Sequence, residues 1–187
     1  MKIKEKTKGL GGIIYTEWLL PIIHYYATLR KNEFIFEVGV PIITALISTR
    51  IYAVLNKIES ALQGLANILP SAISILIGFT AMLITILLTS NGENVEKLKD
   101  LKTEKKIFDK NISLYQNLHI QLSHSLFAEI ILLLIIFFQQ FIYGVVKCVW
   151  LNHCMLFIEI FLTLNILLSI LRGITNIYFS FYNQENR

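Results

Sequence analysis

Residues 68–89 form a run of 22 residues without a charged side chain. An α-helix rises 1.5 Å per residue, so this run spans roughly 30 Å, which is the thickness of a bilayer's hydrocarbon core. The run therefore predicts a membrane-spanning helix, around which we expect the other spans to pack.

Small residues recur along this helix at steps of three or four, so they share one face. These residues are Ser71, Ser74, Gly78, Ala81 and Thr85. A face of small residues lets another helix approach closely, which is the main source of packing energy where lipid is as apolar as leucine. We expect it to be a helix-packing face that seats the third or fourth span. Gly78→Leu should then disrupt assembly more than Ile77→Leu.

Three further apolar runs cover residues 38–55, 126–146 and 154–174. Only 16% of the chain is charged, whereas a soluble domain carries about a quarter. We therefore expect an all-α fold, an integral membrane four-helix bundle. Residues 36–187 would form the membrane domain, and residues 1–35 a cytoplasmic and interfacial segment.

Residues 13–29 combine an apolar run with side chains that favour the headgroup level of a bilayer. These side chains are Tyr15, Trp18, Tyr25 and Tyr26. We expect a short interfacial helix that is kinked at Pro21. The alternative is a fifth membrane span.

Residues 90–125 connect the second and third spans, and positions 93–125 hold six lysines and five acidic residues. Apolar residues recur here at helical spacing. Both ends must return to the same membrane face, and a straight helix of this length would span about 50 Å. We therefore expect a cytoplasmic helical hairpin that turns at residues 109–111, with Asn111 capping its second helix. Residues 56–67 are expected to form a surface turn or a short amphipathic helix, with Pro70 in the first turn of the following span.

Basic residues are distributed unevenly between the two sides of this arrangement. Of the 17, all except Arg50, Lys57 and Lys147 lie on the side of the termini and the long connection. The positive-inside rule then places both termini in the cytoplasm. Arg50 is expected to snorkel to the interface. The alternative is an ion pair with Glu159 on another span.

Polar side chains inside the spans are candidates for function. His124 and Ser125 precede Glu129 by about one turn, and a His–Glu pair at this distance can shuttle a proton. The alternative is an interfacial glutamate that bonds to its neighbours. Gln139 and Gln140 lie deeper and are expected to form hydrogen bonds between helices or between protomers.

The fourth span carries a polar stripe at steps of four, three and four: Asn165, Ser169, Arg172 and Asn176. This face should point into the bundle or towards a protomer interface. It can pack against the small residues of the second span, or it can line a narrow aqueous path in an oligomer.

No motif of an enzyme is present: we find no H-E-x-x-H, G-x-S-x-G or phosphate loop. We therefore expect no catalytic activity, cofactor or metal. Acidic residues interleave with the lysines, which argues against a nucleic-acid partner. Cys148 and Cys154 are expected to be free thiols, with a disulfide as the alternative.

Two stretches carry a family resemblance, ISILIGFTAMLITILLTSNG and NISLYQNLHIQLSHSLFAEIILLLIIFF, with the charged hairpin between them. Over residues 68–140 the layout resembles the small four-span membrane proteins found beside bacterial anti-phage defence genes. These include KwaA-like proteins and the four-helix effectors paired with nucleotide-signalling enzymes. The resemblance implies an effector that oligomerises and damages the inner membrane, or an anchor that recruits a cytosolic partner.

We therefore expect a defence-type membrane effector or scaffold. It would self-associate in the bilayer and be switched by a cytosolic protein through residues 93–125. The alternative function is a small channel or transporter subunit that uses the polar stripe of the fourth span.

Overall fold

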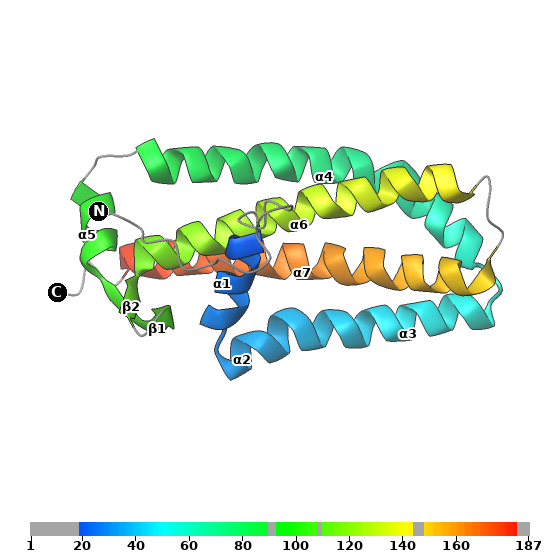
Figure 1. Ribbon diagram of the computed structural model, residues 1–187, viewed down its shortest axis with the longest axis horizontal. Helices are drawn as coiled ribbons and strands as arrows, with labels where there is room; N and C mark the ends of the chain where they lie inside the picture. The colour runs from blue at the N-terminus through cyan, green and yellow to red at the C-terminus, as the bar shows by residue number, and fades with distance from the viewer. Residues whose placement is uncertain (1–18, 90–92, 108–109, 144–147, 183–187) are drawn as a thin grey trace, which may run out of the picture.

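The computed structural model describes residues 19–89, 93–107, 110–143 and 148–182. In this part of the chain, four helices are long and apolar enough to cross a membrane. Figure 1 shows them lying along the longest axis of the molecule. The prediction of an all-α four-helix bundle is confirmed, and this is the architecture of a multi-pass membrane protein.

Within the described residues, the helices are accompanied by one two-stranded sheet. In order they are α1 (Leu20–Thr28), α2 (Lys31–Phe34), the π-helical turn η2 (Ile35–Gly39), α3 (Val40–Val54), α4 (Ile58–Thr89), α5 (Glu93–Asp100), β1 (Lys102–Ile107), β2 (Lys110–Ser113), α6 (Leu114–Tyr143) and α7 (Val149–Tyr182). The first span is the continuous helical segment Lys31–Val54, which is made of α2, η2 and α3. This span, α4, α6 and α7 are each longer than the corresponding apolar run, because hydropathy detects only the part of a helix that lies in hydrocarbon.

The start of α4 differs from the prediction. Residues 58–67 belong to α4 itself, so Pro70 lies inside a continuous helix rather than in its first turn. Ile58 and Leu62 are buried and pack against Leu156 of α7, which makes the extra turns favourable. Figure 1 shows α4 bending in this half, as expected where proline removes a backbone hydrogen bond.

The core of the bundle lies between α4, α6 and α7. It is formed by Leu69, Ile73, Ala128, Leu132, Ile136, Ile166 and Ile170. The contribution of α4 therefore comes from large side chains, each of which buries more apolar surface than a serine or glycine.

The small-residue stripe of α4 faces away from this core. Ser71, Ser74, Gly78 and Thr85 are exposed, and Ala81 is half-buried. A Cβ added at Gly78 would meet nothing within 4 Å. The Ser74 hydroxyl donates to the Pro70 carbonyl at 2.7 Å, and the Thr85 hydroxyl to the Ala81 carbonyl at 2.9 Å. The prediction that the third or fourth span sits on this stripe is wrong, since four of its five residues are exposed.

Gly78→Leu should therefore leave the fold of the single chain intact. We expect its free energy of unfolding to change by less than about 1 kcal/mol, because a surface substitution creates neither a clash nor a cavity. The matched change Ile73→Ala should cost about 2–5 kcal/mol, because it opens a cavity in the core. Thermal unfolding in detergent measures both. Equal losses would contradict the outward orientation, and a smaller oligomer with Gly78→Leu would indicate that a second copy packs on the stripe.

The long connection is not a helical hairpin. It contains the short helix α5 and an antiparallel β-hairpin in which Ile107 pairs with Lys110. Burial alternates along β1, with Thr103, Lys105 and Ile107 turned inwards, and this period of two is characteristic of a strand. The prediction of a helical hairpin was wrong, because a six-residue strand with few apolar side chains shows little of the alternating pattern that identifies a strand.

The N-terminus of α6 is capped by Ser113 rather than by Asn111. The Gln116 amide donates to Ser113 Oγ at 3.2 Å, and the Ser113 amide donates to Gln116 Oε1 at 2.9 Å. This reciprocal pair is a capping box, and it fixes the point at which the hairpin passes into the third span.

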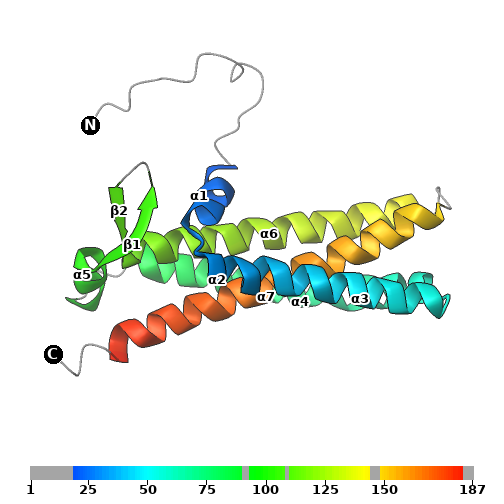
Figure 2. The same cartoon turned by 90° about the horizontal axis from the view of Figure 1, so that it is seen from below.

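The described part of the predicted N-terminal segment contains α1, which packs on α6 and β1. Residues 31–35 differ from the prediction, since they belong to the helical segment of the first span. Pro21 lies in its first turn, so it begins the helix instead of kinking it. Residues 13–18 of the predicted interfacial helix lie outside the described residues. Figure 2 shows α1 and the β-hairpin projecting from the same side of the bundle.

Candidate functional site

Charged side chains from three parts of the chain meet beside α1. Arg172 of α7 bridges two glutamates of the first span: its Nε lies 2.6 Å from Glu37 Oε1, and its Nη1 lies 2.9 Å from Glu33 Oε2. Neither nitrogen has the angle of a hydrogen bond, so these contacts are ion pairs. Glu37 is fully buried. Arg172 thus joins α7 to α2 and η2.

Lys105 of the β-hairpin completes this group. Its Nζ lies 2.9 Å from Glu33 Oε2, and its side chain is only 8% exposed. We refer to Glu33, Glu37, Lys105 and Arg172 as the ionic cluster. Two carboxylates and two cations balance when all four are ionised, which makes their burial tolerable.

Burial lowers the pKa of Lys105 below its ordinary value, and the ion pair with Glu33 opposes only part of this effect. The positive charge of Lys105 is therefore held in place by its partner rather than by water. The attachment of the β-hairpin to the bundle through Lys105 therefore depends on the Glu33 carboxylate.

A π-helical turn carries Glu37 into the cluster. Turns of this type are rare in proteins, and many of those that occur lie at functional sites. In η2, Glu37 and Val38 are buried whereas Ile35 and Phe36 are exposed. The turn therefore places a carboxylate on the face of the first span that meets α7.

Tyr25 of α1 connects the cluster to α6. Its hydroxyl donates a hydrogen bond to Glu37, and its ring stacks on His124 with the ring centroids 3.6 Å apart. The Arg172 guanidinium lies 5.5 Å from the centroid of the same ring. Burial, followed by the charge of Glu37, raises the pKa of Tyr25 above its ordinary value, so the hydroxyl remains a proton donor.

The polar stripe of α7 lies inside the bundle. Asn165 and Ser169 are buried, and Arg172 and Asn176 are half-buried. Asn165 Nδ2 donates to the Glu37 carbonyl at 2.8 Å, and Ser169 Oγ accepts from Ser125 at 3.1 Å.

Gln121 of α6 forms hydrogen bonds with the C-terminal part of this stripe. Its Nε2 donates to the Ser169 carbonyl at 2.7 Å, and its Oε1 accepts from Asn176 at 3.4 Å. The stripe therefore packs on α6 and the first span. The alternative of packing against the small residues of the second span is wrong, because those residues face outwards.

Glu129 links two other spans. It is fully buried, and its Oε1 accepts a hydrogen bond of 2.9 Å from Thr80 of α4. His124 lies on Tyr25 instead, so this structure does not form the proposed His124–Glu129 pair. The role of Glu129 here is an interhelical contact.

The remaining polar candidates lie apart from the ionic cluster. Arg50 is exposed, and Glu159 is buried with no hydrogen-bond partner in the described part of the chain, so the proposed ion pair is wrong. Cys148 and Cys154 are free thiols, as predicted. Gln139 is buried and Gln140 is exposed, and both line a cavity between α4 and α6.

Sequence reasoning missed most of the ionic cluster. Of its four residues, only Arg172 was a candidate from the sequence, as a member of the polar stripe of the fourth span. One signal was available: the two glutamates are four positions apart and so share a face, beside an otherwise apolar run.

Comparison with protein-family models, curated proteins and solved structures finds no match to this chain. Within the described residues, no group of three or more His, Cys, Asp or Glu side chains is arranged to hold a metal ion. The functional argument therefore rests on the ionic cluster and on the segment that Lys105 connects to it.

Proposed function

We propose that this chain is a bacterial inner-membrane protein of the defence type, an effector or scaffold with both termini in the cytoplasm. It self-associates in the bilayer and is switched by a cytosolic protein that binds α5 and the β-hairpin. The layout of the spans and the uneven distribution of basic residues support this assignment. No chemical reaction is part of the proposal.

The ion pair between Lys105 and Glu33 is the observation that carries the proposal. It ties a segment outside the spans to a carboxylate that also contacts Arg172 of α7. If a partner pulls the hairpin away, two glutamates face Arg172 alone in a poorly solvated site. An uncompensated buried charge is costly, so the first and fourth spans must repack.

The hairpin also offers a surface for a partner. Lys102, Glu104 and Lys106 on β1 are exposed, on the strand face opposite Lys105. A partner with a mixed-charge surface can bind there without first breaking the ionic cluster. Binding and switching are then separate steps of one mechanism.

A small channel or transporter subunit is the alternative function. It would use the polar stripe of α7 as its path. Its support is weaker, because Asn165, Ser169 and Arg172 already contact the first span and α6. For this stripe to line a pore in an oligomer, these contacts have to break.

The proposal can be tested by charge reversal on the exposed face of the hairpin. Lys102→Glu with Lys106→Glu should abolish capture of the cytosolic partner after in-cell crosslinking, and should abolish phage-triggered depolarisation reported by a voltage-sensitive dye. Lys57→Glu, exposed at the opposite end of the bundle, is the matched control and should retain both.

Two outcomes would contradict the proposal. One is an unchanged membrane potential together with no captured partner in the wild-type chain during infection. The other is equal loss in the hairpin variant and in Lys57→Glu. Partner capture without depolarisation would assign the scaffold role instead of the effector role.

A further inference from the structure

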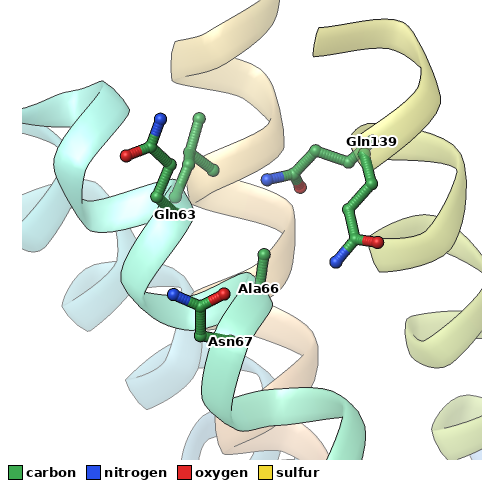
Figure 3. Close-up of a pocket in the computed structure, with 6 residues that line it drawn as sticks. Gln63, Ala66, Asn67 and Gln139 are labelled. Carbon is green, nitrogen blue, oxygen red and sulfur yellow. The ribbon is translucent and has the colours of Figure 1, made fainter. Parts of the chain in front are cut away.

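A cavity of about 290 Å³ lies between the start of α4 and the end of α6, at the opposite end of the bundle from the β-hairpin (Figure 1). Figure 3 shows Gln63, Ala66 and Asn67 of α4 across from Gln139 of α6. Leu62 and Gln140 complete the lining. Four of the six lining side chains are carboxamides, and none is charged.

Gln139 is the most informative of these residues. It is only 5% exposed, and its Oε1 has no hydrogen-bond partner within the described residues. A buried amide oxygen without a partner is unfavourable, because it has lost its hydrogen bonds to water. Because Gln139 lines the cavity, a molecule inside the cavity is positioned to supply the missing donor.

The chemistry of the lining selects the ligand. A carboxamide both donates and accepts hydrogen bonds, and hydroxyl groups do the same. A charged group would lose its hydration here without meeting an opposite charge. The volume is at the lower end of ligand pockets, so it suits a small unit with several hydroxyls.

The position of the cavity favours a lipid over a soluble molecule. Gln63 lies five residues before the apolar run 68–89, about 8 Å outside it along the helix, which corresponds to the headgroup level. Ile68, Phe138 and Phe141 flank the lining residues in sequence and are 61–77% exposed. Side chains of this kind suit contact with acyl chains.

We propose that this cavity binds the vicinal hydroxyls of a lipid headgroup, as in the terminal glycerol of phosphatidylglycerol, whose phosphate stays outside the cavity in the hydrated interface. The headgroup hydroxyls bond to the carboxamides of Gln63, Asn67 and Gln139. The acyl chains run along the exposed aromatic side chains of α6. This site is independent of the ionic cluster and of the proposed switch.

The full chain, purified and reconstituted in nanodiscs, provides the test, with native mass spectrometry reporting the lipid that it retains. Phosphatidylglycerol should be retained in preference to phosphatidylcholine, which lacks the diol. Gln139→Leu and Gln63→Leu should each weaken retention about fivefold to tenfold, since each removes a neutral hydrogen bond. Asn152→Leu, at the same end of the bundle on α7 and outside the cavity, should retain the lipid as the wild type does.

Equal retention of the two lipids would overturn the proposal, as would wild-type retention by Gln63→Leu. Gln63 is exposed, so this variant decides the question even if Gln139→Leu fails to fold. Free glycerol is the further arm. If it displaces phosphatidylglycerol at equal concentration, the diol chemistry holds but the ligand is a soluble polyol, and the lipid assignment fails.

Discussion

Replacing Arg172 with methionine is expected to lower the free energy of unfolding by about 3–5 kcal/mol, the usual cost of removing one partner of a buried ion pair. Methionine keeps much of the length of the side chain, so the loss comes from charge rather than from volume. Glu33 and Glu37 would face each other with only Lys105 to balance them. Thermal unfolding of the purified chain in detergent measures the effect.

Arg50→Met is the matched control for this prediction. Arg50 is exposed in the same bundle, so its loss should change the free energy of unfolding by less than about 0.5 kcal/mol. The double variant Arg172→Met with Glu37→Gln removes one charge of each sign and should recover part of the stability. If the two arginine variants unfold alike, Arg172 does not hold the spans together.

Lys105→Glu is expected to release the β-hairpin from the bundle. The new carboxylate would lie beside Glu33, where the structure has an ammonium 2.9 Å away. Breaking a buried ion pair costs about 3 kcal/mol, which raises the equilibrium constant for local opening by more than about a hundredfold. Hydrogen exchange at the amides of β1 and β2 should accelerate by about that factor.

Lys106→Glu on the same strand separates charge from position. Lys106 is exposed, so exchange at the strand amides should remain near the wild-type rate. Equal acceleration in both variants would show that the hairpin does not depend on the ionic cluster. In cells, the proposed switch predicts that Lys105→Glu depolarises the membrane without a phage trigger and that Lys106→Glu does not.

The β-hairpin and the first span show why part of the site was predictable and part was not. The inward polar stripe of α7 could be read from its spacing, because residues at steps of three and four share a helix face whatever packs on it. The partners of that stripe could not be read in this way. Glu33 and Lys105 are 72 positions apart, and their contact exists only because the hairpin folds back beside α1.

The face of α4 that packs is a similar case. Both faces of this helix satisfy the rules for a span, because small residues and large apolar residues are each compatible with lipid and with helix packing. Ile73 and Leu69 meet α6 and α7, whereas Gly78 does not. The choice depends on which surface fits the neighbouring helices, and one helix alone does not contain that information.

The sequence by itself determined the four apolar spans and the all-α class, because hydropathy is a local property and the thickness of the bilayer sets the length of the helix that crosses it. Only the tertiary structure decided the β-hairpin, the outward face of Gly78 and the ionic cluster. These features depend on contacts between residues far apart in the chain. The energy of such contacts comes from shape and from charge pairing in a poorly solvated interior, which no local pattern records.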